Sequence, residues 1–119
     1  VTGIGVNRKK PVQEAAVLNL ANETLEYIGV EARVPAEKVV AFDDYVGPGY
    51  SLPTDAMVEA VKMLAHTEGI LLDPVYSGKA MSGLIDLARK GYFPKGSNVL
   101  FLHTGGSPAL YAYLPTFRA

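Results

Sequence analysis

The chain has 119 residues, a size that suits one domain or part of one. Hydrophobic residues make up 49% and charged residues 19%, which excludes a disordered tail and supplies enough apolar surface for a packed core. Lysine and arginine number 11 against 12 for aspartate and glutamate, without a basic block, so nothing supports nucleic-acid binding. There is no cysteine, so disulfides and thiolate metal sites are excluded.

The apolar runs and the amino terminus indicate whether the chain crosses a membrane or carries a targeting signal. Every apolar run is far shorter than the roughly 20 residues that span a bilayer, so we expect no membrane segment. The opening VTGIGVNRKK lacks the order of a signal peptide, and with no targeting signal visible we expect a cytoplasmic protein. It also lacks an initiator Met and resembles a strand already under way. We therefore expect the chain to be a piece of a longer protein.

The first half of the chain predicts a strand, a helix and a second strand. Val1–Val6 is apolar and indicates a buried strand. A helix follows from Pro11, whose missing N–H costs nothing in a first turn, to a stop at Gly29. Lys38–Phe42 is the second predicted strand. The predicted helix gathers five apolar residues on one face: Val17, Leu18, Ala21, Leu25 and Ile28.

The second half repeats this alternation. Thr54 is a good N-cap for a helix that ends at Gly69, and Asp55 in its first turn favours the helix dipole. The remaining predicted elements are a buried strand at Ile70–Leu72, a helix that ends at Gly91, a strand at Val99–Leu102 and a helical turn from Ser107-Pro108. The apolar faces of the two helices are Met57, Val61, Leu64 and Ala65, and Met81, Leu84, Ile85 and Ala88.

Strands and helices thus alternate four times, and the strands are continuously apolar. This order predicts an α/β fold with a parallel sheet and helices on both faces. No linker divides the sequence, so we expect residues 1–119 to form a single unit.

Two strand-to-helix turns have the same character. Tyr76-Ser77-Gly78 follows one predicted strand, and Thr104-Gly105-Gly106 follows the next. Ligands of open α/β sheets bind at the carboxyl ends of strands, glycines let the backbone approach a ligand, and helix starts offer unpaired N–H groups. With the phenols of Tyr50 and Tyr76 near the same rim, the pattern favours a planar, polar, partly anionic small molecule.

The same residues can also be explained by structural roles that involve no ligand. Ser77 is also explained as a helix cap, and either tyrosine alone as an amphipathic packing residue. His103 ends an apolar strand, which is typical of a hydrogen-bonded core histidine, and His66 late in a helix is expected to face solvent. Asp43 and Asp44 point to opposite faces if extended. Since no set of ligands converges, we predict no metal site.

Lys79 lies beside a glycine in the sequence SGKA, which suggests a lysine that forms a Schiff base. We expect instead a surface or structural lysine that points to solvent. Its position in a first helical turn and its neighbours give no reason for a lowered pKa.

The stretch GPGYSLPTDAMVEAVKMLAHTEGILLDPVYSGKAMSGLIDLARKGYFPKGSNVLFLHTGGSPALYAY closely resembles the carboxy-terminal part of a pyridoxal-phosphate enzyme family. That family contains the D-cysteine desulfhydrases and the 1-aminocyclopropane-1-carboxylate (ACC) deaminases, within the tryptophan-synthase-β-like fold type II. The resemblance is most specific over Gly47–Tyr113 and softer over Val1–Phe42.

The resemblance implies pyridoxal 5'-phosphate as cofactor, with the Schiff-base lysine and the phosphate loop upstream of Val1 rather than in this sequence. It implies that Tyr50 and Tyr76 are the active-site tyrosines. Ser77 and Thr104, with Gly105 and Gly106, would lie at the cofactor, the two hydroxyls near its pyridine nitrogen. Full-length relatives tend to be homodimers, and we expect this chain alone to be inactive.

Positions 77 and 104 separate the subfamilies. ACC deaminases typically have Glu after DPVY and Leu after the strand-end His, whereas this chain has Ser77 and Thr104, the desulfhydrase-like combination. We therefore predict β-elimination of D-cysteine to pyruvate, hydrogen sulfide and ammonia, with a relaxed D-amino-acid deaminase of the same family as a near alternative. ACC deamination to 2-oxobutyrate and ammonia, and a non-catalytic α/β piece that binds a small anion or a partner, remain as alternatives.

Overall fold

A computed structural model describes residues 1–118 of the chain. Its elements in order are β1 Thr2–Ile4, α1 Lys10–Tyr27, the 3-10 helix η1 Ala36–Lys38, β2 Val40–Phe42, α2 Asp55–Glu68, α3 Ser77–Arg89, the 3-10 helix η2 Ser107–Tyr113 and α4 Leu114–Phe117. None of these described helices combines the length and the apolar character needed to cross a membrane.

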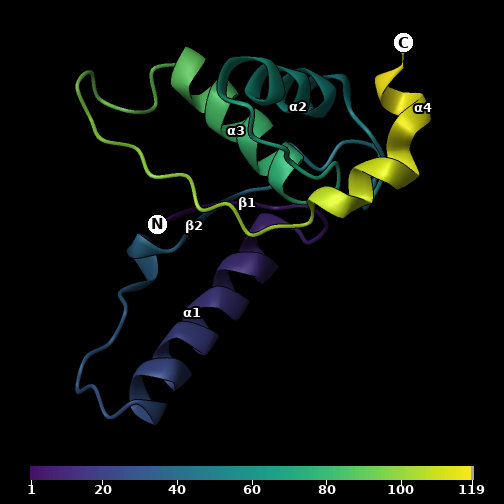
Figure 1. Cartoon of the computed structure of the whole chain (residues 1–119). Coiled ribbons are helices and arrows are strands. Elements are labelled where there is room, and N and C mark those ends of the chain that lie inside the picture. The colour runs from purple at the N-terminus through teal and green to yellow at the C-terminus, as the bar shows by residue number, and fades with distance from the viewer. Residues whose placement is uncertain (119) are drawn as a thin grey trace.

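The two strands form a parallel sheet. Thr2 lies opposite Val40 and Ile4 lies opposite Phe42, and α1 connects the strands as a crossover helix. Figure 1 shows α1 on one side of the sheet, with α2 and α3 on the other side. The predicted α/β class, a parallel sheet with helices on both sides, is therefore confirmed.

Two of the predicted strands are wrong within residues 1–118. Neither Ile70–Leu72 nor Val99–Leu102 forms a ladder with any described segment, and a strand exists only where a neighbour supplies the hydrogen bonds. Most of their apolar side chains are exposed, with Leu100 92% exposed, although Leu72 is buried in the core. The two segments do approach each other, since Nε2 of His103 lies 3.0 Å from the carbonyl oxygen of Leu71.

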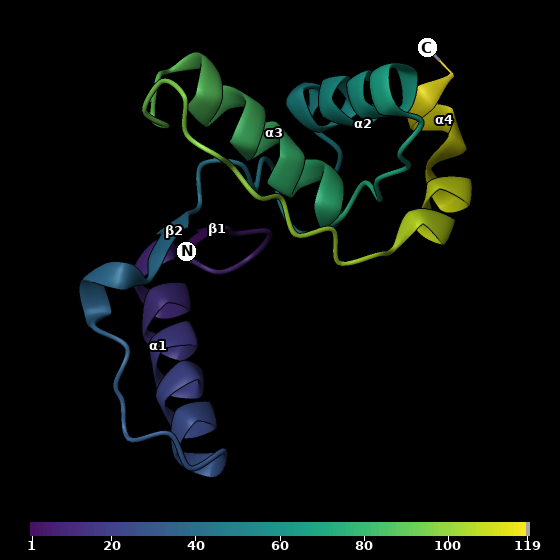
Figure 2. The same ribbon diagram turned by 60° about the vertical axis from the view of Figure 1, so that its left-hand side comes forward.

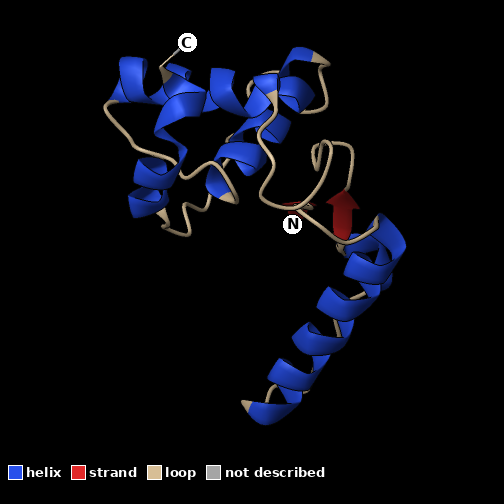
Figure 3. Ribbon diagram, turned by 90° about the vertical axis from the view of Figure 1, so that its right-hand side faces the viewer, coloured by secondary structure: helices blue, strands red, loops and turns tan. Residues whose placement is uncertain are grey.

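The amino-terminal strand and helix form where the sequence predicts them, but they are not buried. Thr2 and Gly3 of β1 are exposed, and α1 contains no buried residue although Pro11 lies in its first turn as expected. Figure 3 shows α1 projecting away from the rest of the molecule. Burial of Val1–Val6 is thus a wrong prediction, because within the described residues only a two-stranded sheet covers this region.

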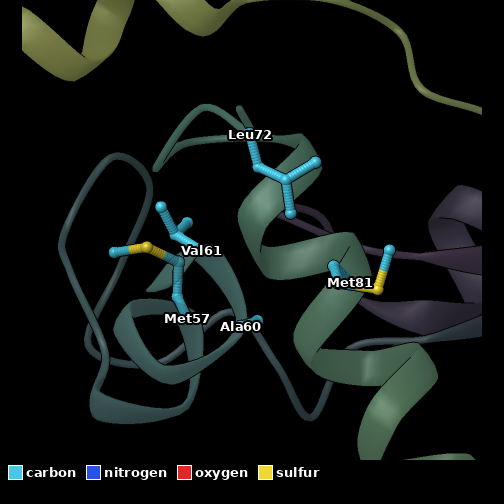
Figure 4. Packing of buried hydrophobic residues seen from close by; sticks show 5 residues of the cluster. All are labelled: Met57, Ala60, Val61, Leu72 and Met81. Carbon is cyan, nitrogen blue, oxygen red and sulfur yellow. The ribbon is translucent and has the colours of Figure 1, made fainter. Parts of the chain in front are cut away.

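The core lies between α2 and α3, which run beside each other (Figure 2). Five apolar residues form it, as Figure 4 shows: Met57, Ala60, Val61, Leu72 and Met81. The predicted bounds of α2 are confirmed. The Thr54 hydroxyl accepts a hydrogen bond from the Met57 N–H at 3.2 Å, and Gly69 ends the helix with a φ of 67°.

Glycines on α3 allow two close approaches. A Cβ on Gly78 would lie 2.6 Å from the carbonyl oxygen of Asp73 and 2.9 Å from Cγ2 of Val61. A Cβ on Gly83 would lie 2.6 Å from Cδ1 of Ile4 in β1. At Gly78 a Cβ would meet backbone, so the start of α3 lies tightly on α2; at Gly83 the Ile4 side chain would have to shift, so the middle of α3 lies close to the sheet.

Candidate active site

Tyr50 and Tyr76 meet at the surface, as the sequence predicts. Tyr50 comes from the loop after β2 and Tyr76 directly precedes α3. Their phenol oxygens share a hydrogen bond, and their ring centroids lie 6.0 Å apart at an interplanar angle of 62°. The side chains are 45% and 48% exposed. The hydrogen bond with Tyr50 raises the pKa of Tyr76, so Tyr76 keeps its proton at neutral pH.

Asp73 organises the first of the two turns. Oδ1 of its buried carboxylate accepts hydrogen bonds from the N–H of Ser77 at 2.7 Å and from the Ser77 hydroxyl at 2.6 Å. Oδ2 accepts from the N–H groups of Val75 at 2.8 Å and Tyr76 at 2.7 Å. Burial alone would raise the pKa of Asp73, but these hydrogen bonds outweigh it and lower the pKa. The ionised carboxylate therefore fixes the start of α3 and the backbone of Tyr76.

The Ser77 hydroxyl is part of this arrangement. It donates its proton to Asp73 and accepts a hydrogen bond from the Asp73 N–H at 2.8 Å, and Ser77 is buried. A hydroxyl has one proton, so Ser77 can donate to a ring nitrogen only if it leaves Asp73. Ser77 is the first residue of α3 rather than its N-cap, which is Tyr76. Its contact with a cofactor stays a prediction.

The second turn lies against the first. A Cβ on Gly106 would come within 2.9 Å of Cγ of Asp73, so the two turns meet at that carboxylate. The Thr104 side chain is exposed, and its hydroxyl makes no hydrogen bond within residues 1–118. An added Cβ on Gly105 would touch nothing within 4 Å, which leaves open space beside the backbone. The turns are neighbours as predicted, and the cofactor contacts of Thr104, Gly105 and Gly106 stay predictions.

His103 shapes the second turn. Its Nδ1 accepts a hydrogen bond from the Gly105 N–H at 3.0 Å, so a proton on Nε2 is available to the carbonyl oxygen of Leu71. Its hydrogen bonds agree with the predicted structural role, although the side chain is exposed rather than in the core. His66 is exposed, as expected. Among residues 1–118, no group of three or more acidic or histidine side chains could hold a metal ion.

Lys79 has the predicted structural role, but the expectation that it points to solvent with no reason for a lowered pKa is wrong. The side chain is 0% exposed, and its Nζ donates to the carbonyl oxygens of Val46 at 2.7 Å and Gly49 at 3.0 Å. Burial lowers the pKa of the amine. The carbonyls that replace water belong to a loop about 30 residues earlier, so the sequence around Lys79 gives no sign of them.

Asp73 is a residue of the candidate site that the sequence did not lead us to expect. A usable signal was present, since aspartate just before a helix start commonly accepts hydrogen bonds from the first N–H groups.

Comparison with known proteins identifies the family. The model of the family described as "Pyridoxal-phosphate dependent enzyme" matches residues 2–105. Proteins named 1-aminocyclopropane-1-carboxylate deaminase from Rhizobium rhizogenes and Pseudomonas syringae pv. syringae are 42% and 44% identical to 99% of this chain. A solved structure titled "Crystal Structure Analysis of the ACC deaminase homologue" matches 98% of the chain with a TM-score of 0.82 and 37% identity.

The chain spans only part of these proteins. It covers 35% of the length of the two relatives and 34% of the solved chain. The family model nevertheless extends from β1 to Gly105, so it covers the first turn and reaches into the second. The chain therefore belongs to the pyridoxal-phosphate dependent enzyme family.

Proposed function

We propose that the full-length protein removes the amino group of a small amino acid with pyridoxal phosphate, and that Tyr50 and Tyr76 contact the substrate. The observation that carries this proposal is the exposed, hydrogen-bonded tyrosine pair beside the two turns that meet at Asp73. The pair has two phenolic protons, and one of them forms the hydrogen bond between the two phenol oxygens. The second proton is free to be donated outward, for example to a substrate carboxylate.

The second turn fits the cofactor better than the first, because the Ser77 hydroxyl is buried and donates its proton to Asp73. Bound pyridoxal phosphate would delocalise the negative charge left on the substrate when a bond at its α-carbon breaks. The open backbone at Gly105 and the exposed Thr104 hydroxyl offer polar contacts to the cofactor ring. Lys79 is unsuited to hold the cofactor covalently, since its amine is buried and bound to two carbonyls. On the resemblance, the lysine that does so precedes Val1.

The comparisons favour ACC as the substrate. The relatives reported above carry the name of that deaminase, and the chain is 42% and 44% identical to them over nearly its whole length. The expected products are 2-oxobutyrate and ammonia, with one water consumed.

Ser77 and Thr104 favour D-cysteine as a second candidate. A carboxylate at a pyridine nitrogen keeps it protonated and makes the cofactor a strong electron sink, whereas a hydroxyl supports a weaker one. Opening an unactivated cyclopropane needs the stronger sink. Eliminating a thiolate from the β-carbon needs less, and it yields pyruvate, hydrogen sulfide and ammonia with one water consumed.

One assay distinguishes the candidates. The full-length protein, loaded with pyridoxal phosphate, is incubated separately with ACC and D-cysteine, and 2-oxobutyrate, pyruvate and sulfide are measured. Turnover of ACC alone supports the first candidate, and release of sulfide and pyruvate alone supports the second. Failure to release ammonia from either compound or from other small D-amino acids would contradict the proposal.

The tyrosines are tested in the same assay. Tyr50→Phe and Tyr76→Phe each remove one phenol, and we expect kcat/KM to fall about tenfold to hundredfold, as the loss of a hydrogen bond to a charged group implies. Tyr111→Phe is the matched control, because Tyr111 is 79% exposed and belongs to η2. Equal activity of all three variants would place the substrate elsewhere.

A double substitution tests the role of the two hydroxyls. If Ser77 and Thr104 lie at the ring nitrogen, Ser77→Glu combined with Thr104→Leu should shift the ratio of ACC to D-cysteine turnover toward ACC. Ser97→Ala is the control, because this hydroxyl donates to Pro94 in an exposed turn. An unchanged ratio would remove the two hydroxyls from the account of substrate choice.

The oligomeric state is a separate proposal. On the family resemblance, we propose that the full-length enzyme is a homodimer. Sedimentation equilibrium of the loaded protein is expected to give twice the mass of one chain, and a monomer would contradict this.

A further inference from the structure

The backbone on both sides of Tyr50 is held by side chains from other elements. The Gly49 carbonyl oxygen accepts a hydrogen bond from Nζ of Lys79 at 3.0 Å. The Ser51 carbonyl oxygen accepts one from the Tyr113 hydroxyl at 2.9 Å. One anchor comes from the first turn of α3 and the other from the end of η2. The loop of Tyr50 is thereby joined to α3 and to η2, which directly follows the second turn.

Ser51 adopts a conformation that needs such support. Its φ is 63°, the left-handed region, and it is the one non-glycine residue there among residues 1–118. A side chain with a Cβ is strained in this region, and the conformation persists only where the surroundings hold it. The hydrogen bond from Tyr113 to the Ser51 carbonyl is a contact that does so.

Lys79 is a costly residue if packing is its only role. Its amine is fully buried, and no carboxylate pairs with it within the described residues. Burying an unpaired cation is unfavourable, and an apolar side chain of the same length would fill the space without that penalty. What an apolar side chain lacks is the ability to bind both carbonyls. These belong to Val46 and Gly49, and they fix the loop directly before Tyr50.

Lys79 also lies in the right place to join the two tyrosines. It follows Tyr76 by three residues on the same helix start, and the carbonyl that it binds immediately precedes Tyr50. The Nζ contacts therefore set the loop of one phenol against the helix that carries the other.

We propose that Lys79 and Tyr113 are positioning residues that fix the backbone on either side of Tyr50 and so hold its phenol against that of Tyr76. This inference rests on the proposed function only in taking the tyrosine pair to contact the substrate. The placement of the pair itself is measurable without any turnover.

The experiment uses the full-length protein loaded with pyridoxal phosphate. The variants are Lys79→Met, which keeps the length but loses the donors, Lys79→Arg, which keeps donors and charge, and Tyr113→Phe. The controls are Lys95→Met and Tyr111→Phe, whose parent side chains are exposed. NMR of isotope-labelled tyrosine rings follows the titration of Tyr76, with Tyr50→Phe as the reference for a broken pair. Steady-state kinetics are recorded on whichever substrate is turned over.

The expected results separate positioning from packing. In Lys79→Met, Tyr76 should titrate as it does in Tyr50→Phe, and kcat should fall about hundredfold with a smaller change in KM, the scale expected for a displacement of about 1 Å. Lys79→Arg should restore most of both signals. Tyr113→Phe should lower kcat about tenfold and shift the titration of Tyr76 toward that of Tyr50→Phe. The controls should match the parent.

Two results would overturn the inference. One is a Lys79→Met protein whose Tyr76 titrates as in the parent and whose kcat is unchanged. If Lys79→Met does not fold, the other is a folded Tyr113→Phe protein with unchanged Tyr76 titration. Loss of the tyrosine pair in a protein that turns over neither ACC nor D-cysteine would support the positioning role while contradicting the proposed function.

Discussion

Helices α1 and α2 carry apolar residues at the same helical spacing, yet Met57 and Val61 of α2 are buried and no residue of α1 is. The difference lies in their neighbours. Helix α2 packs against α3, whereas α1 faces a sheet of two strands with three residues each. Beside it lies a groove of about 650 Å³, lined by residues of β1, α1 and β2 and by none of the predicted site residues. Periodicity predicts a helix, but burial depends on what the rest of the fold places beside it.

The largest difference in stability between substitutions in α2 and in α1 is expected for apolar side chains. Met57→Ala should lower the free energy of unfolding of this chain by about 3 kcal/mol, because it leaves a cavity between α2 and α3. Leu18→Ala on the half-buried face of α1 should cost less than about 1 kcal/mol. Urea unfolding followed by circular dichroism measures both values. Equal losses would show that the two helices are covered alike.

The second difference is expected at glycines, because Gly78 of α3 lies much closer to its neighbours than Gly3 of β1 does. Gly78→Ala should cost about 2 to 3 kcal/mol, since its Cβ would meet backbone of Asp73 at 2.6 Å. Gly3→Ala in β1 should change stability by less than about 0.5 kcal/mol, because the nearest atom is 3.7 Å away. The same unfolding assay applies. A tolerated alanine at position 78 would mean that α3 does not start as described.

Asp73 makes the stability of the α2–α3 region depend on pH. Asp73→Asn should cost about 2 kcal/mol at pH 7, because an amide cannot accept all the hydrogen bonds that the carboxylate accepts. The pKa of Asp73 is lowered on folding, so its stabilisation is present above the unfolded value near 3.9 and is lost as the pH falls through the folded pKa. Thermal midpoints of the parent and the variant should therefore converge in acid. A constant difference between them would contradict this assignment.

The smallest expected effect is at the start of α2. Thr54→Ala removes the hydroxyl that accepts from the Met57 N–H and should cost about 1 kcal/mol. Lys9→Ala, at the start of α1, is the comparison, because Lys9 makes no side-chain cap there. It should be nearly neutral in the same assay. A neutral Thr54→Ala would mean that the cap contributes nothing to α2.

Local features of the sequence predict the helices and their ends, as Thr54 and Gly69 show for α2. Two kinds of feature escape such reasoning. A strand needs a partner, so the strands predicted from the apolar runs at Ile70–Leu72 and Val99–Leu102 are wrong: neither run has a ladder among residues 1–118. A buried lysine needs distant acceptors, so Lys79 resembles a surface residue until the loop of Val46 and Gly49 closes over it.

The candidate site also contains features that the sequence predicts and features that it does not. The tyrosines are predictable because both follow turn sequences at the carboxyl ends of predicted strands, and the two turns do meet. The role of Asp73 is predictable only in part: its place before a helix start suggests a capping carboxylate, but the four donors converge on it only once α3 has formed. Because the Ser77 hydroxyl donates its proton to Asp73, this proton is not free for a cofactor. The residue type alone does not reveal this hydrogen bond.

The central claim is that the Tyr50–Tyr76 pair and the Thr104 turn face one cofactor and its substrate. A crystal structure of the full-length protein with pyridoxal phosphate and an unreactive substrate analogue tests it most directly. We predict a phenol oxygen of the pair within about 3 Å of a polar atom of the analogue, and the Thr104 hydroxyl at the edge of the cofactor ring. A cofactor bound on another face, with both phenols open to solvent, would contradict the account.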